Sequence, residues 1–335
     1  MTSYLMNQPH GMVSEAVEGF VSSHPDIVRV HRDPLYVSRT TRPAPDKVTL
    51  VSGGGSGHEP LHTGFVGTGM LDAAVPGAVF SSPTAIQVRA AIEDVGSTAG
   101  TVLIVKNYTG DVLNFSVAAE LLQGSHDIET VLVDDDLATK NSAEHDLGGR
   151  GTAAVVVVEK ACGAAAEAGA TLTQVRDLGR DIVARSATLS AAFDACTNPL
   201  TGRRSFELQP GELEFGIGIH GERGIETRTK VAADELVDSL LAPIVDHLSM
   251  GRGDRALLIV NGLGATHPLE LAVAARAARR QLQGCGIGIA RSLVGNYVTA
   301  LDMHGVSLTL TAVDDTLIDL WDAPVRTAAL TWGQA

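Results

Sequence analysis

The order of short apolar runs and helix-favouring segments is the feature that most constrains the fold of this chain. Runs such as 101–105 are the length of a strand, and most are followed by a turn and then by a segment with helical periodicity. This alternation is typical of α/β proteins, in which helices cover a mainly parallel sheet. The sequence therefore predicts two α/β domains with mainly parallel or mixed sheets.

The expected elements follow from apolar periodicity, turn residues and helix-start signals. Helices are expected at 12–23, 85–95, 113–122, 231–248, 268–282 and around 317–321, and two Ala-rich helices are expected between 153 and 185. Strands are expected at 47–51, 101–105, 130–133, 187–193, 205–208, 213–219, 256–260 and 306–312. Because the pattern restarts with several strands after residue 185, the predicted domains are 1–185 and 186–335.

Charge and hydropathy exclude several classes of protein. The chain has 25 basic and 39 acidic residues, so its net charge of −14 repels nucleic-acid phosphates. No apolar run reaches the ~18 residues of a membrane span. The first residues also lack the basic and apolar regions of a secretory signal. We therefore expect neither nucleic acid nor membrane as a partner.

The three cysteines indicate the compartment. Cys162, Cys196 and Cys285 are few, odd in number and far apart, which argues against a disulfide framework or a zinc ribbon. Free thiols of this kind are typical of a reducing environment. The sequence predicts a cytoplasmic protein.

Several Gly-rich or polar segments directly follow predicted strands, where α/β proteins bind their ligands. They are 53–62, 106–111, 218–224 and 261–266. The run 53–57 has two interpretations, an anion cradle built from backbone N–H groups or a tight turn that needs positive φ. It is not a Walker A loop, because no Gly-Lys-Ser/Thr follows.

The segment from His58 to His62 matches the zinc-binding pattern H-E-x-x-H. That site needs both histidines on one regular helix, one turn apart. Pro60 interrupts the motif and glycines flank it, and proline is tolerated only in the first turn of a helix. We therefore reject a zinc site and expect no metal on this chain.

Three further positions have open interpretations. His220 follows a predicted strand among glycines and is either a base or nucleophile or a histidine held in a turn. Asp111 opens a predicted helix and is either its N-cap or a general base. The run 134–136 of three aspartates either binds Mg²⁺ or is a solvated loop, and we favour the loop.

Five segments together resemble one known family, the K subunit of dihydroxyacetone kinase. The resemblance covers the chain from about residue 12 to its end. The matching segments are VSGGGSGHEPLHTGFVGTGMLDAAVPG at 51–77, KNYTGDVLNF at 106–115, FGIGIHGERGIE at 215–226, LVGNYVTALDM at 293–303 and LWDAPVRTAAL at 320–330.

The resemblance implies a role for three side chains. His220 matches the histidine that binds the substrate carbonyl carbon covalently as a hemiaminal, which selects dihydroxyacetone over glycerol. His58 matches the histidine that hydrogen-bonds the ligand and assists formation of this adduct. Asp111 matches the carboxylate that accepts the proton of the hydroxyl as it attacks phosphorus.

The resemblance also implies a substrate pocket and partners. Gly54 and Gly55 match backbone contacts to the ketose, and Lys106 lies in the matched pocket segment. The nucleotide and Mg²⁺ belong to a separate L subunit, which carries ATP or a bound ADP that a phosphotransferase system rephosphorylates. The K subunits are homodimers, so we expect a homodimer that needs an L partner for activity.

Two alternatives remain beside dihydroxyacetone phosphorylation. The first is a subunit of a kinase for ketotetroses such as erythrulose, which would use the same chemistry. The second is a regulatory sensor that binds the ketose and contacts a transcription factor. The presence of Asp111 favours the enzyme, because a sensor has no need for a general base.

Overall fold

The computed structural model describes residues 4–140 and 148–333, which form two compact units. The N-terminal unit comprises 4–133, 155–181 and 319–333, and the C-terminal unit comprises 134–140, 148–154 and 182–318. These units differ from the predicted domains 1–185 and 186–335 because the chain crosses between them at 133, 154, 181 and 318. The predicted boundary at 185 assumed that each domain is one continuous segment of the chain, and it stays a prediction.

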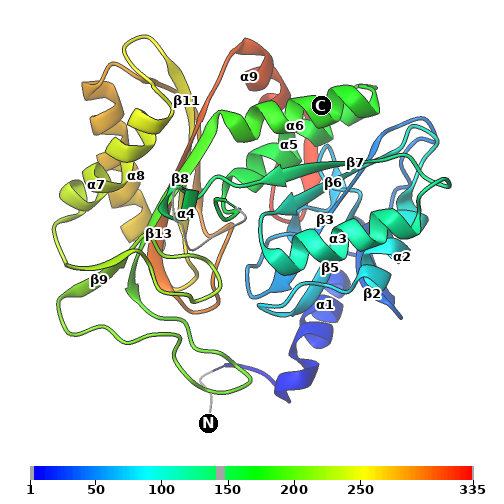
Figure 1. Cartoon of the computed structure of the whole chain (residues 1–335), viewed down its shortest axis with the longest axis horizontal. Coiled ribbons are helices and arrows are strands. Elements are labelled where there is room, and N and C mark those ends of the chain that lie inside the picture. Colours follow the sequence, from blue (N-terminus) through cyan, green and yellow to red (C-terminus); the bar gives the residue numbers. More distant parts are fainter. Residues whose placement is uncertain (1–3, 141–147, 334–335) are drawn as a thin grey trace. The chain divides into compact units, whose positions relative to one another are not determined.

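A mixed sheet of six strands forms the centre of the N-terminal unit (Figure 1). Neighbouring pairs from β5 to β7 are parallel, whereas β1 and β2 add an antiparallel edge. The prediction of a mainly parallel sheet is confirmed here. The strand order is β1 (Val28–Arg32), β2 (Leu35–Arg39), β5 (Ala73–Val79), β3 (Thr49–Ser56), β6 (Thr101–Lys106) and β7 (Ile128–Val133).

Helices cover both faces of this sheet because side chains alternate along each strand. Val51 of β3 and Leu103 of β6 lie in a buried cluster with α2 (Ala85–Val95) and α3 (Thr109–Leu121). On the other face, Ser52 of β3 lies near α5 (Ala154–Glu167), and Val131 of β7 contacts α6 (Leu172–Ala184).

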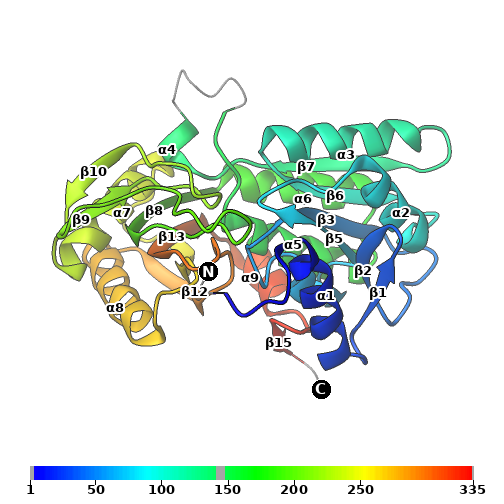
Figure 2. The same ribbon diagram turned by 90° about the horizontal axis from the view of Figure 1, so that it is seen from below.

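Shorter elements complete the N-terminal unit. The helix α1 (Met12–Ser23) packs beside the β1 edge (Figure 2). The remaining elements are the 3₁₀ helices η1 (Pro9–Gly11) and η2 (Thr63–Phe65), a small sheet of β4 (Gly67–Thr68), β14 (Val325–Thr327) and β15 (Thr331–Trp332), and the end of α9 (Asp315–Asp322).

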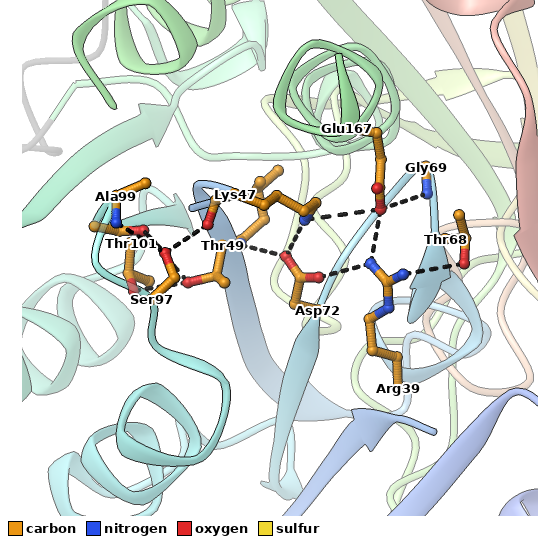
Figure 3. A network of polar contacts seen from close by, with 12 residues as sticks. Arg39, Lys47, Thr49, Thr68, Gly69, Asp72, Ser97, Ala99, Thr101 and Glu167 are labelled. Carbon is orange, nitrogen blue, oxygen red and sulfur yellow. Dashed lines mark hydrogen bonds and ion pairs between the residues drawn. The ribbon is translucent and has the colours of Figure 1, made fainter. Parts of the chain in front are cut away.

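A buried network of charges connects α5 to the sheet (Figure 3). Asp72 is fully buried and accepts from Nη1 of Arg39 at 2.9 Å and from Nζ of Lys47 at 2.7 Å. Glu167 at the end of α5 accepts from the same Arg39 nitrogen at 2.7 Å. Two cations and two anions balance one another, which offsets the cost of removing charges from water. The network therefore holds the C-terminal end of α5 in place.

The C-terminal unit has a second mixed sheet of six strands. Only β11 and β12 are parallel, so this sheet is mainly antiparallel. Helices α7 (Ala233–His247) and α8 (Pro268–Gly284) lie side by side over it (Figure 1), and α4 (Leu137–Lys140) contacts the same core. The strand order is β10 (Glu226–Thr229), β9 (Glu212–Phe215), β8 (Ser186–Asp194), β13 (His304–Ala312), β11 (Arg255–Gly262) and β12 (Gly288–Gly295).

Three predictions about strands are wrong. The glycines after residue 52 do not form a loop, because β3 continues through Ser56. Residues 205–208 form no strand, and the strand expected at 213–219 ends at Phe215. Gly216 has a φ of +71°, which a regular strand cannot contain, so the backbone turns there.

Two further observations concern the state of the cysteines and the length and polarity of the helices. Cys162 and Cys196 are buried, Cys285 is exposed, and none of them forms a disulfide. Burial raises the pKa of Cys162 to about 12, so little of the reactive thiolate exists at neutral pH. Across residues 4–140 and 148–333, no helix is both long and apolar enough to cross a membrane.

Candidate functional site

The predicted glycines Gly54 and Gly55 lie at the carboxyl end of β3, where a side chain has no room. A Cβ at Gly54 would lie 2.4 Å from Nζ of Lys106, and one at Gly55 would lie 2.6 Å from the backbone nitrogen of Ser81. Both distances are below any normal contact. At Gly54 and Gly55 glycine therefore serves close approach, whereas Gly57 at the end of the run has a φ of +107°, as the tight-turn interpretation expects.

Lys106 and Asp111 form a buried ion pair beside these glycines. Lys106 is the last residue of β6, and Asp111 lies in the first turn of α3, whose N-cap is Tyr108. The distance from Nζ to Oδ2 is 3.7 Å, and the residues are 0% and 2% exposed. Oδ1 of Asp111 has no hydrogen-bond partner in the described part of the chain. The pair thus offers both a donor and an acceptor to a small polar ligand.

His58 lies in the turns that follow β3 and is buried. Its ring stacks on Phe80 with a centroid distance of 5.3 Å. No helix runs from His58 to His62, as expected from Pro60. Among the described residues, no group of three or more His, Cys, Asp or Glu side chains could hold a metal ion.

Three residues behind Lys106 were not predicted from the sequence. Nε2 of His62 lies 3.1 Å from Nζ of Lys106, and Nδ1 of His62 lies 2.6 Å from Oε1 of Glu159 and 3.0 Å from Oγ of Ser52. All of them are buried. Two signals were present in the sequence. His62 is the second histidine of the rejected zinc motif, and Glu159 is a charged residue that directly follows the apolar run 153–158 in an expected helix.

Electrostatics in this cluster follow from burial. Burial lowers the pKa of His62 well below its usual value, and the charges of Lys106 and His58 lower it further. Burial also raises the pKa of Glu159 to about 8, although Ser52 and Lys106 act against this shift. His62 is therefore a neutral imidazole, and Glu159 changes its charge near neutral pH.

His220 lies in the C-terminal unit. It is not at the end of a strand as predicted, because β9 ends five residues earlier. Its backbone N–H donates to Oε2 of Glu222 at 2.8 Å, and Oε1 of Glu222 accepts from Nη1 of Arg150 at 3.0 Å. A Cβ at Gly218 would collide with this carboxylate. Arg150 and Glu222 thus shape the loop that carries His220, while the other predicted site residues lie in the N-terminal unit.

The aspartate run 134–136 is not the solvated loop that we favoured. Asp135 and Asp136 are 0% and 1% exposed. Asp135 accepts from the backbone and hydroxyl of Thr152 at 2.6 and 2.7 Å, and Asp136 accepts from Nε of Arg150 at 2.8 Å. Burial raises the pKa of Asp136 to about 6. These carboxylates hold the C-terminal unit together.

Comparison with known proteins identifies relatives over nearly the whole chain. The model of the Dak1 domain family matches residues 18–329. The PEP-dependent dihydroxyacetone kinase, dihydroxyacetone-binding subunit DhaK, of Escherichia coli (strain K12) is 41% identical over 98% of this chain and 99% of its own.

Two solved structures are similar throughout. The dihydroxyacetone kinase of C. freundii has a TM-score of 0.89 and 32% identity, over 99% of this chain and 60% of that one. The dihydroxyacetone kinase operon co-activator DhaQ has a TM-score of 0.88 and 30% identity, over 94% of this chain and 96% of that one.

Proposed function

The chain belongs to the Dak1 domain family, and on this premise we propose that it is the dihydroxyacetone-binding subunit of a dihydroxyacetone kinase. The observation that carries the proposal is the buried pair of Lys106 and Asp111. An ammonium and a carboxylate with an unpartnered oxygen can bind the hydroxyl of a small ligand and then take its proton.

His220 is the residue that we propose captures the carbonyl group. A ring nitrogen forms a bond to the carbonyl carbon, and the electron pair of the C=O bond moves to oxygen. That oxygen takes up a proton while the neutral imidazole loses its own N–H proton, so the hemiaminal is neutral. His58 donates a hydrogen bond to the ligand during this step. Glycerol has no electrophilic carbon and forms no such adduct.

Asp111 is the proposed general base for phosphoryl transfer. As the terminal hydroxyl oxygen bonds to phosphorus, its O–H bond breaks and the proton passes to the carboxylate. Lys106 donates hydrogen bonds in the pocket, and the backbone at Gly54 and Gly55 contacts the ketose.

We also propose the partners and the location of the protein. A separate L subunit carries the nucleotide and Mg²⁺, and the DhaK relative described as PEP-dependent favours bound ADP over exchangeable ATP. The subunit acts as a cytoplasmic homodimer.

A calorimetric titration of the purified chain tests the substrate. Dihydroxyacetone and erythrulose are expected to bind and glycerol is not, and the ketose with the lower Kd is the better candidate for the physiological substrate. Mass spectrometry of the mixture, after rapid desalting without a reducing agent, checks whether the protein carries the added mass of the ketose. A folded chain that binds neither ketose would refute the proposal.

The variant Gly54→Ala tests the close approach of Lys106. The new methyl group would lie 2.4 Å from Nζ of Lys106 and displace the ammonium, so we expect ketose affinity to fall by about tenfold or more. Gly124→Ala is the control, since a Cβ there meets nothing within 4 Å, although its φ of +84° costs some stability. Unchanged affinity in the Gly54 variant would show that Lys106 is not held where the structure has it.

The variant Glu222→Ala tests the loop that carries His220. Loss of the carboxylate leaves the His220 N–H and Arg150 without this acceptor, and a hydrogen bond to a charged group contributes about 1.5–3 kcal/mol. We expect ketose affinity to fall by about tenfold, with ketose specificity retained. Glu226→Ala, on the exposed strand β10, is the control, and equal loss in both variants would contradict a positioning role for Glu222.

A regulatory sensor is the second candidate function. The similarity of the DhaQ co-activator supports it, because that protein has the same fold at 30% identity. Turnover of dihydroxyacetone with a nucleotide-binding L subunit would favour the kinase. Ketose binding without turnover beside any L subunit would favour the sensor.

A further inference from the structure

A continuous line of polar contacts runs from Asp111 into the core of the N-terminal unit. Asp111 lies 3.7 Å from Lys106, Lys106 lies 3.1 Å from Nε2 of His62, and Nδ1 of His62 lies 2.6 Å from Oε1 of Glu159. The four side chains come from α3, β6, the segment after β3 and α5, and all are buried. Two of them, His62 and Glu159, have no place in the proposed reaction.

The hydrogen atom of His62 can be located from its neighbours. An ammonium can only donate, so Nε2 of His62 must accept from Lys106. The hydroxyl of Ser52 donates to the carbonyl of Ile104 at 2.7 Å, so its oxygen is also an acceptor toward Nδ1. The proton of the neutral imidazole therefore lies on Nδ1 and is donated to Glu159.

The state of Glu159 decides whether this arrangement persists. An ionised Glu159 accepts from Nδ1–H and leaves Nε2 free to hold Lys106. A Glu159 protonated on Oε1 would instead donate to Nδ1 and move the imidazole proton to Nε2. That N–H would then face the Lys106 ammonium, and two donors in contact repel one another. The charges of Glu159 and Lys106 are thus linked through the ring of His62.

We propose that Glu159 and His62 are positioning residues, which fix the Nδ1–H tautomer and thereby hold the Lys106 ammonium beside Asp111. The consequence rests on the proposed function: an ammonium held there pairs with Oδ2 of Asp111 and leaves Oδ1 open to accept from the substrate hydroxyl. Neither residue needs to touch the ketose. Their effect reaches the reaction only through Lys106.

The fold keeps α5 in the position that this role requires. Glu167 lies two turns beyond Glu159 on the same helix and is held by Arg39 at 2.7 Å (Figure 3). One end of α5 is therefore anchored by ion pairs away from Lys106, and the middle carries the carboxylate that contacts His62. Glu167 does not contact the line itself, so Glu167→Gln is expected to lower kcat through a looser α5 but to keep the pH dependence that Glu159 causes.

The titratable groups around this line are known within the described part of the N-terminal unit. Lys106 and His58 face His62, and Lys106 and Cys162 face Glu159, while Asp111 lies beyond Lys106. Burial raises the pKa of Cys162 to about 12, above the range of interest. Because the pKa of Glu159 is raised to about 8, its ionised form, and with it the firm hold on Lys106, increases as the pH rises toward 8.

The first test measures the tautomer in the unmodified chain. Nitrogen-15 NMR of labelled histidine, assigned by comparison with His62→Gln, is expected to show a protonated Nδ1 and an unprotonated Nε2 for His62 at pH 8.5. The ring should stay neutral well below the pH at which an exposed histidine takes up its second proton, because burial lowers the pKa of His62. A protonated Nε2 at pH 8.5 would overturn the proposal. This measurement needs no substrate, so it is decisive even if the proposed function fails.

The second test measures turnover of dihydroxyacetone with the L subunit. In the wild-type chain kcat is expected to rise between pH 6 and 8. Glu159→Gln and His62→Gln are each expected to lower kcat by about 10- to 100-fold and to flatten this rise. Both variants should still form a detectable ketose adduct. The double variant should lose no more than the worse single variant, because both act through one ammonium. Glu167→Gln should keep the wild-type pH profile.

Three results would contradict the proposal in this assay. They are a wild-type pH profile in Glu159→Gln, losses that multiply in the double variant, and a flattened profile in Glu167→Gln as well. Failure of the wild-type chain to bind a ketose would instead refute the proposed function. If Glu159→Gln does not fold, as judged by thermal unfolding, the NMR measurement on the unmodified chain decides.

Discussion

The Asp111→Asn variant is expected to bind dihydroxyacetone almost normally and to transfer the phosphoryl group about 10²–10⁴-fold more slowly. Asparagine has the size of aspartate, so it keeps the hydrogen bond to the substrate hydroxyl, but its amide oxygen cannot hold the proton at neutral pH. Single-turnover kinetics with the L subunit measure the chemical step, and calorimetry of the variant alone measures binding.

Asp127→Asn is the matched control for this experiment. Asp127 is an exposed aspartate of the same unit and should retain full activity. Equal single-turnover rates for Asp111→Asn and the unmodified chain would remove Asp111 from the role of base. A proportional loss of binding and rate would assign it to substrate binding instead.

The second large effect is expected for His220→Ala. Without the imidazole no hemiaminal forms, so the added mass of the ketose should vanish, and affinity for dihydroxyacetone should fall by about two orders of magnitude. The preference over glycerol should disappear with it, because the carbonyl group no longer meets a nucleophile. Mass spectrometry and calorimetry on the same samples measure both effects.

His247→Ala provides the comparison, since His247 is an exposed histidine in the last turn of α7 in the same unit. It is expected to form the adduct normally. An adduct of normal mass in His220→Ala would assign carbonyl capture to another residue, and His58 would be the next to replace.

Most helices could be predicted because their signals are local. The capping box at Thr84 and Gln87 starts α2, and Pro268 at the first position starts α8, as the sequence indicated. The strands β1, β2, β4, β5, β10, β12, β14 and β15 were missed. Strand pairing depends on partners distant in the chain: β5, for example, pairs with residues of β3 between Val51 and Ser56, and its own sequence AAVPGAV carries a proline.

The site residues that lie in continuous sequence motifs could be predicted. His58, Asp111 and Lys106 lie in two such motifs, and the structure places all three in the N-terminal unit. Glu159 was not predictable in this way. It lies about 100 residues from His62, and nothing in an Ala- and Val-rich helix indicates that its one buried carboxylate contacts a histidine.

The sequence by itself determined the α/β class, the helix starts and the family motifs, since these depend on neighbours within a few residues. The tertiary structure decided the contacts that depend on distant segments. Only folding brings Nε2 of His62 to Lys106 and Glu159 to Nδ1 of His62, and only burial raises the pKa of Glu159 to about 8. Removal from water and contact across the sheet are properties of the packed unit, so no local pattern could have shown them.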